Sequence, residues 1–298
     1  MELEEAGLAS DVEINKPIKI LLLGSDSNIG QEFLKFSNDL SEFSLTPFTQ
    51  DQFNQACFID IGLDQYDVAL DALSLGAKAD DAYLKQIKSC NQAILGSDIS
   101  MFMLSSVMVF TGNKEAAYEE NDVPDSDTDE GKQLAEIEGS VLDGEMSVVL
   151  RSGWLFGGKD EDVVANTLTS FIAGDEVYLQ DDFIGNPTPI SDLVRVAFSL
   201  IKQRHYGANN SGVYHYSCAE DISWFGFGEA ISVNATQFNM QLQTSLKPIN
   251  EYQAESSDLA LLRRQSLSCR KIFNHFGVKQ RPWRASLRSL VKELYQTN

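Results

Sequence analysis

Short apolar runs alternate with segments of helical periodicity over the first half of the chain. An apolar run at residues 18–23 ends at Gly24, and residues 28–40 then place apolar side chains at near-helical spacing. Continuous apolar runs of this length are typical of strands buried in a parallel sheet. Further strands are predicted over 42–46, 66–72, 101–104 and 147–151, and helices over 79–95 and 128–142. This order predicts an α/β fold with a Rossmann-like doubly wound parallel sheet.

Beyond Gly157 the pattern is less regular. It predicts a helix over 163–173, a strand over 176–179, a turn at 185–187, a helix over 190–202 capped by Ser191 or Asp192, a strand-helix pair over 213–233 and a basic, helical segment over 263–295. We therefore divide the chain into an acidic N-terminal tail (1–16), a Rossmann-like domain (17–157) and a smaller C-terminal lobe (158–298). The lobe is expected to be interleaved with the remaining core elements.

Composition and charge narrow the class of protein. The 298 residues are 43% hydrophobic, which suffices for one large domain or for a main domain with a smaller lobe. The formal net charge of −21 would repel nucleic acid and anionic membranes. No apolar run approaches the roughly 20 residues that a membrane helix needs, and the acidic N-terminus does not have the pattern of a secretory signal. We expect a soluble, cytoplasmic protein.

The cysteines and the acidic residues do not indicate a metal site. Cys57, Cys90, Cys218 and Cys269 are far apart and form no CxxC motif, so reduced thiols are expected. Residues 119–130 carry alternating carboxylates that imitate a calcium loop, but Glu130 stands where such a loop needs glycine. We interpret this segment as a solvated acidic loop before a helix.

The segment LLLGSDSNIG has the context of a phosphate-binding turn. Gly24 follows a buried strand and Gly30 lies in the first turn of the next helix, where backbone amides receive a pyrophosphate. Ser27 stands at the position of the middle glycine, where its Cβ would crowd the ligand. The end of the second strand has neither an acidic residue for a ribose hydroxyl nor an arginine for a 2′-phosphate. Phosphate binding and a simple strand-to-helix turn both stay open here.

Six segments in order resemble the dTDP-4-dehydrorhamnose reductase family of extended short-chain dehydrogenase/reductases. They are KILLLGSDSNIGQEF, LSSVMVFTGNK, RSGWLFG, DDFIGNPTPISDLVR, GVYHYSCAEDISWFGFGEAI and the arrangement from Arg263 through Trp283. The resemblance covers most of the chain from Lys19 to about Leu294. It implies an NAD(P)-binding domain over 17–157, a nucleotide-sugar lobe over 158–298, and NADPH or NADH as cofactor.

The resemblance also implies site residues. Ser106 matches the residue that hydrogen-bonds the substrate keto oxygen, and Lys132 matches the lysine of the family's YxxxK motif. Thr128 stands where that motif has its catalytic tyrosine. Cofactor contacts fall on Gly24, Ser27, Asn28, Ile29, Gly30, Asp71, Ala72 and Lys132, and substrate contacts on Ser106, Trp154, Asn186 and Pro187. Trp154 suits ordinary core packing equally well, and Asp71, Val107 and Phe183 also depart from the family pattern.

The absence of a tyrosine at residue 128 leads to three hypotheses about function. Reduction of a ketone needs a proton donor, and a threonine hydroxyl is a far weaker acid than a phenol. The first hypothesis is a pseudoenzyme: a reductase-like protein that binds a nucleotide sugar or dinucleotide with little turnover. It would act with a protein partner or as a homodimer, and both alternatives stay open. The second is an active NAD(P)H-dependent reductase of a 4-keto nucleotide sugar, and the third is a structural interaction protein. Two interpretations of Tyr118 stay open: it supplies the proton in place of the missing tyrosine, or it only packs within its loop. His215 is expected to be a histidine buried in the core.

Overall fold

The computed structural model describes residues 16–55, 61–158, 162–238, 240, 242, 246–250 and 263–297. The predicted N-terminal tail, apart from Lys16, and Cys57 lie outside these residues. Within the described part of the chain, no helix combines the length and the apolar character needed to cross a bilayer.

Six parallel strands form the central sheet, which confirms the predicted α/β fold. They are β1 (Ile18–Leu23), β2 (Phe43–Phe48), β3 (Val68–Asp71), β4 (Ser100–Ser106), β5 (Val148–Ser152) and β10 (Gly212–Tyr216). Their spatial order is β2-β1-β3-β4-β5-β10. The order reverses beside β1, and Leu23 lies opposite Asp71 in the register of β1 and β3. Ligands of such sheets bind at the carboxyl ends of the strands around this reversal.

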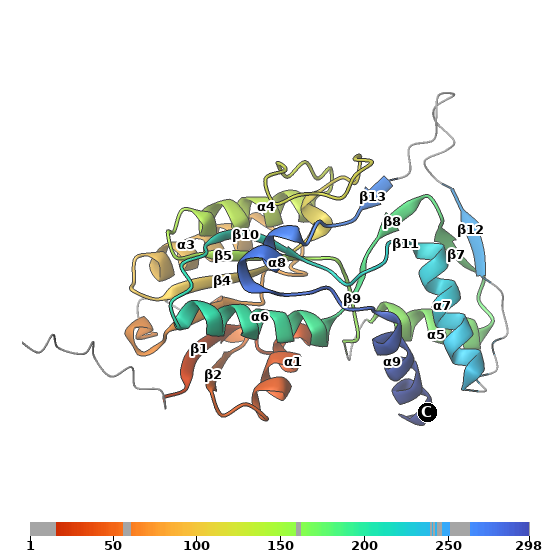
Figure 1. Ribbon diagram of the computed structural model, residues 1–298, viewed down its shortest axis with the longest axis horizontal. Helices are drawn as coiled ribbons and strands as arrows, with labels where there is room; N and C mark the ends of the chain where they lie inside the picture. Colours follow the sequence, from red (N-terminus) through yellow and green to blue (C-terminus); the bar gives the residue numbers. More distant parts are fainter. Residues whose placement is uncertain are drawn as a thin grey trace, which may run out of the picture.

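Helices cover both faces of the sheet (Figure 1). One face carries α1 (Asn28–Ser37), α6 (Ile190–His205) and α8 (Arg270–Phe276), and the other carries α3 (Asp81–Leu95) and α4 (Asp129–Leu142). The Phe198 ring of α6 contacts Phe33 and Phe36 of α1 and Phe43 of β2. Short helices α2 (Gln50–Gln55), η2 (Leu63–Gln65) and η3 (Val107–Val109) lie in the connections.

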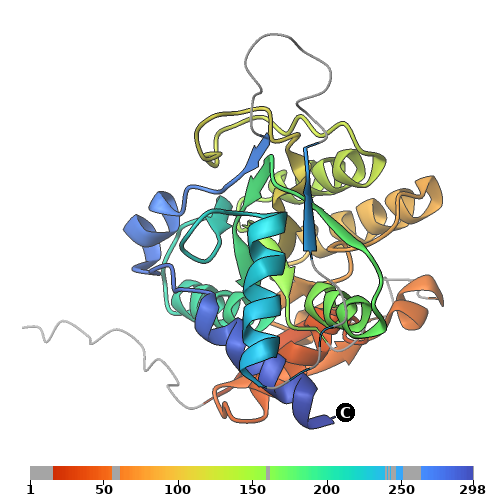
Figure 2. The same cartoon turned by 90° about the vertical axis from the view of Figure 1, so that its right-hand side faces the viewer.

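A smaller lobe packs beside the carboxyl ends of the strands. It contains α5 (Val163–Ala173), α7 (Trp224–Gln237), α9 (Arg284–Thr297) and the two-stranded sheet of β7 (Val177–Gln180) and β12 (Leu246–Ile249). Figure 2 shows the molecule from the side of this lobe. Phe156, Phe227 and Trp283 are among its buried side chains. The lobe has its own apolar core, which allows it to form one wall of a cleft.

Two small sheets join the lobe to the central sheet. Strand β6 (Trp154–Phe156) pairs with β9 (Pro187–Pro189), and β8 (Phe183–Gly185) pairs with both β11 (Ile222–Ser223) and β13 (Arg263–Gln265). Helix α6 and strand β10 come from the second half of the chain and complete the large domain. The boundary at residue 157 stays a prediction.

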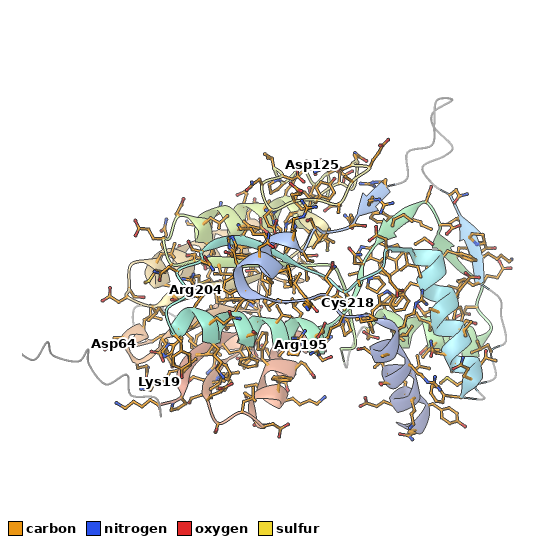
Figure 3. The ribbon with its side chains drawn as sticks, in the orientation of Figure 1. Lys19, Asp64, Asp125, Arg195, Arg204 and Cys218 are labelled. Carbon is orange, nitrogen blue, oxygen red and sulfur yellow. The ribbon has the colours of Figure 1, made fainter. Side chains whose placement is uncertain are left out.

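Three local expectations were wrong. Helix α1 ends at Ser37 rather than at residue 40. Pro189 precedes α6 without a side-chain cap, and Asp192 instead accepts hydrogen bonds from Arg195 and Tyr216. Figure 3 labels Arg195 on α6 and Cys218, whose thiol lies 3.6 Å from the Asp192 carboxylate. The segment over 263–295, predicted to be helical throughout, begins as a strand because β8 offers it an edge to pair with. Its first helix, α8, ends at Gly277, whose φ is +67°, before α9 begins.

Candidate functional site

A cavity of about 590 Å³ lies between the central sheet and the smaller lobe, at the carboxyl end of β4. Its wall combines residues from both halves of the chain: Leu75, Gly76, Ser106, Met108, Phe110, Ser126, Asp127, Thr128, Gly153, Trp154, Leu155, Val163, Phe183, Trp224, Arg263 and Gln265. The fold therefore brings together Ser106, Thr128 and Trp154, three of the residues expected at the site. Most of the wall is apolar, as is typical of a small-molecule site.

Of the three hydroxyl groups that line the cavity, those of Ser106 and Thr128 are positioned by backbone amides. Ser106 ends β4, and its Oγ accepts a hydrogen bond from the amide of Met108 at 3.2 Å. Thr128 is the N-cap of α4, and its Oγ1 accepts from the amide of Gly131 at 3.1 Å. A Cβ on Gly131 would overlap the carbonyl oxygen of Met108. The first turn of α4 can thus pack closely against the end of β4, which holds both hydroxyls at one wall.

Aromatic rings form another part of the cavity wall. The rings of Trp154 and Trp224 are stacked, with centroids 4.1 Å apart, and Phe183 meets Trp154 edge-on at 5.6 Å. Trp154 Nε1 donates to Gln265 Oε1 at 3.3 Å, and its ring covers Gly185, where any Cβ would overlap it. Trp154 thus packs in the junction and also lines the cavity. Its contact with a sugar stays a prediction.

Lys132 lies one helical turn after Thr128 but does not line the cavity. Its ammonium donates to the backbone carbonyl of Asp127 at 2.9 Å and lies 3.9 Å from the carboxylate of Asp129. More than half of its side-chain surface is exposed. The spacing of the YxxxK motif is therefore preserved on α4, while the lysine is turned toward the preceding loop.

The predicted phosphate turn keeps a compact backbone with a polar cap. Gly24 has a φ of +78° and lies against Ala72 and Leu73, and a Cβ on Gly30 would overlap the carbonyl oxygen of Gly24. Ser27 caps α1: its Oγ donates to the carbonyl of Gly24 at 2.7 Å and accepts from the amide of Gly30 at 3.1 Å. The first turn of α1 has no acidic residue. The amides of Gly24, Ser25, Ser27 and Gly30 already donate to acceptors within the protein, and phosphate binding by this turn stays a prediction.

The comparisons with known proteins assign the chain to a family. The model of the family described as "RmlD substrate binding domain" matches residues 79–296. The chain belongs to this family. It is 26% identical to a dTDP-4-dehydrorhamnose reductase of Aggregatibacter actinomycetemcomitans over 204 residues, which are 67% of this chain and 68% of that protein.

Solved structures support the fold of this family member. A dTDP-4-dehydrorhamnose reductase of Clostridium acetobutylicum superimposes with a TM-score of 0.78 at 20% identity, over 93% of this chain and 99% of that one. The enzyme of Bacillus anthracis, solved in complex with NADP, superimposes with a TM-score of 0.74 at 18% identity, over 95% of this chain and 100% of that one. At these identities the likeness concerns the Rossmann-like fold.

Asp71, predicted to contact the cofactor, is held by local hydrogen bonds. The carboxylate is fully buried at the end of β3 and accepts hydrogen bonds from the amides of Leu73 and Ser74 and from the Ser74 hydroxyl. Burial raises the pKa of Asp71. Its neighbour Ala72 is also fully buried. These hydrogen bonds fix the backbone that follows β3, and a contact of Asp71 with the cofactor stays a prediction.

Asn186 and Pro187, whose contact with the nucleotide sugar stays a prediction, lie in the junction between the small sheets. The Asn186 amide donates to Asp221 at 2.7 Å and accepts from the Leu267 amide at 3.1 Å. Pro187 lies in β9 opposite Trp154. Both residues are buried and neither lines the cavity. They join the small sheets that hold Trp154 in place.

Tyr118 and His215 are both packed in the interior. The Tyr118 ring stacks on Phe110 with centroids 4.0 Å apart, and its hydroxyl accepts from the Gly112 amide at 3.1 Å. Burial raises the pKa of Tyr118. His215 lies 3.2 Å from the carbonyl of Tyr118, and burial, aided by Arg151, lowers its pKa to about 3. Neither side chain lines the cavity, so neither is placed to donate a proton there.

Three carboxylates of the acidic loop contact different residues of the protein. Asp125, which Figure 3 labels above α4, accepts from the amide and hydroxyl of Thr111, both at 2.9 Å. Asp122 pairs with Lys114, and Asp127 approaches Arg263 at 3.6 Å. Across the described residues, no group of three or more histidine, cysteine or acidic side chains is arranged to hold a metal ion.

Sequence reasoning did not assign several residues that support the site. Trp224, Arg263 and Gln265 line the cavity although they lie more than 70 residues beyond Gly153. Glu138 of α4 and Arg151 of β5 form a buried ion pair at 2.7 Å, and the Glu138 carboxylate also accepts a hydrogen bond from the Ser105 hydroxyl. The tryptophan and Arg263 occur in segments that resemble the family. The position of Glu138 on the buried face of its helix was a signal for the ion pair.

Proposed function

We propose that the protein binds a nucleotide sugar and a nicotinamide dinucleotide in the cleft between its lobes, as a dTDP-4-dehydrorhamnose reductase-like protein with impaired reduction. The observation that carries this proposal is the composition of the cavity wall. The hydroxyls of Ser106, Ser126 and Thr128 line the cavity together with aromatic rings, and none of the described lining residues is a tyrosine, histidine, cysteine or lysine. The wall can bind a ligand, but it has no phenol to protonate an alkoxide.

The residues present define what each could do for bound ligands. The capped N-terminus of α1, with Ser27, would hold the dinucleotide phosphates, and a bound reduced nicotinamide would supply hydride. The Ser106 hydroxyl, whose oxygen accepts from Met108, keeps its proton for a substrate carbonyl oxygen. The Thr128 hydroxyl can donate a hydrogen bond to the same oxygen, but it is too weak an acid to transfer its proton efficiently.

The wider role follows from binding without efficient turnover. Such a protein would act as a binding or regulatory protein in the cytoplasm, through a protein partner or a second copy of the chain. The acidic net charge and the buried thiols of Cys90, Cys218 and Cys269 support this placement. An active reductase that uses Ser106, Lys132 and a water as proton donor is the alternative, supported by the preserved spacing of Lys132 on α4.

Calorimetric titration tests the proposal. NADPH and then NADH are titrated into the purified protein, each with and without dTDP-glucose, followed by an assay of NADPH oxidation with a dTDP-linked 4-keto sugar. Micromolar binding with turnover well below that of an intact reductase is expected. Binding with fast turnover would favour the active reductase, whereas the absence of binding to either kind of ligand would overturn the proposed function.

A further inference from the structure

Asp26 links the glycine turn to the end of β2. It lies between β1 and α1, and its carboxylate Oδ1 accepts a hydrogen bond from the Gln50 amide at 2.9 Å. Gln50 begins α2, directly beyond the end of β2 at Phe48. The Phe48 carbonyl in turn accepts from the amides of Gly24 and Ser25, at 2.8 and 3.1 Å. These contacts hold the exposed carboxylate of Asp26 at the carboxyl end of β2.

The carboxyl end of this strand is where Rossmann-like folds hold the adenosine ribose of a dinucleotide. An acidic residue there accepts a hydrogen bond from the ribose 2′-hydroxyl of NAD, whereas an arginine accommodates the 2′-phosphate of NADP. Strand β2 ends in Pro47 and Phe48 and supplies neither group. Asp26 supplies a carboxylate from the neighbouring turn instead. The Gln50 amide occupies one of its two oxygens, which leaves the other for a ribose hydroxyl.

The segments around this strand end offer no positive charge. From residue 36 to residue 77 the chain contains no lysine or arginine. The same stretch contains seven acidic residues: Asp39, Glu42, Asp51, Asp60, Asp64, Asp67 and Asp71. It includes all of β2, α2 and β3. A phosphate monoester carries about 1.5 to 2 negative charges at pH 7. These elements therefore provide no cation to offset the repulsion between a 2′-phosphate and Asp26.

From this arrangement we infer that Asp26 makes the protein select NADH over NADPH. This inference rests on the proposed function, because it assigns a preference between the two dinucleotides. The Asp26 carboxylate accepts a hydrogen bond from the 2′-hydroxyl of NADH and repels the 2′-phosphate of NADPH. NADPH still binds, but about ten- to a hundredfold more weakly than NADH, as expected for like charges a few ångströms apart near a protein surface.

The first experiment titrates NADH and NADPH into the parent protein and two single-charge variants. Asp26→Asn keeps an oxygen for Gln50 and for the ribose hydroxyl but removes the charge. It should tighten NADPH binding about tenfold and weaken NADH binding about two- to fivefold. Asp64→Asn removes the same charge before β3, at the opposite end of the sheet (Figure 3), and should leave the ratio of the two affinities unchanged. An unchanged ratio in Asp26→Asn, or an equal change in both variants, would overturn the role of Asp26.

The second experiment separates a charge effect from a packing effect. Salt screens the repulsion between exposed charges, so the preference of the parent for NADH should shrink as NaCl rises from about 0.05 M to about 0.5 M. In Asp26→Asn the ratio of the two affinities should depend much less on salt. A preference for NADH that salt does not change would show that packing sets it, and would overturn the inference.

Titrations with AMP and adenosine 2′,5′-bisphosphate separate this inference from the proposed function. The two probes carry the adenosine ribose without nicotinamide and differ only in the 2′-phosphate. Tighter binding of AMP that is lost in Asp26→Asn, without binding of NADH, would support the role of Asp26 and contradict the dinucleotide function. Binding of NADPH as tight as that of NADH in the parent would do the reverse. No binding of any of the four compounds would overturn both.

Discussion

The hydroxyl of Thr128 already has a structural task in the fold. It caps α4 by accepting from the Gly131 amide at 3.1 Å, and it lies 3.2 Å from the Ser126 hydroxyl. A tyrosine phenol cannot make the same short cap, because its oxygen lies at the far end of the ring. The residue that would restore a general acid therefore removes an N-cap. Catalysis and helix stability are in conflict at this position.

Thr128→Tyr is the direct test at the residue scale. We expect NADPH-dependent reduction of a dTDP-linked 4-keto sugar to rise by about 10²- to 10⁴-fold, because a phenol can protonate the alkoxide. The free energy of unfolding should fall by about 1 kcal/mol through loss of the cap. NADPH oxidation and urea denaturation measure the two effects.

Thr128→Ala is the matched control for this substitution. It loses the same cap without gaining a phenol, so its stability should fall similarly and its turnover should not rise. Equal turnover in the tyrosine and alanine variants would show that the missing acid does not limit the reaction.

At the scale of elements, β1, its turn and α1 form a unit that depends on two glycines. Gly24 needs its positive φ and lies against Leu73, and Gly30 lets α1 approach the turn. The sequence motif indicated this unit correctly. The short strands β6, β8, β9, β11 and β13 were missed, because runs of two or three residues have no detectable alternation and pair only when the lobe is assembled.

Replacing two helical glycines by alanine tests how tightly this unit is packed. Gly30→Ala places a Cβ on the carbonyl oxygen of Gly24 and should destabilise the protein by about 1–3 kcal/mol or more. It should also weaken NADPH binding, since the turn must open. Thermal denaturation and calorimetric titration measure the two effects.

Gly139→Ala provides the comparison within α4. Gly139 is exposed, and a Cβ there would contact nothing within 4 Å. Alanine should stabilise the helix by about 0.5–1 kcal/mol. A Gly30→Ala protein as stable as the parent would contradict the close packing of α1 on its turn.

At the scale of the whole molecule, a buried polar network links the sheet to α4. Glu138 pairs with Arg151, which lies 3.4 Å from His215 Nε2. Burial, aided by Arg151, lowers the pKa of His215 to about 3 in the folded protein. The unfolded chain, with a histidine pKa of about 6.5, then binds more protons between these values. The free energy of unfolding therefore decreases as the pH falls below about 6.5.

This linkage predicts the pH dependence of stability. As the pH falls from 6.5 toward 5, His215 should cost up to about 1.4 kcal/mol of unfolding free energy per pH unit. His215→Gln should remove that part of the slope, measured by urea denaturation at several pH values. His205→Gln, at an exposed position, serves as the control and should keep the slope of the parent. Identical slopes for the His215 variant and the parent would contradict the prediction.

The sequence by itself determined the parallel sheet, its main helices, the position of the glycine turn and the absence of a tyrosine at residue 128. These features depend on local periodicity, caps and short motifs, which are written in adjacent residues. Only the tertiary structure decided that Ser106 and Thr128 share a wall, that Asp71 and Asn186 are buried, and that Arg263 lies beside Asp127. Those relations depend on contacts between residues far apart in the chain, and the assembly of the two lobes creates them.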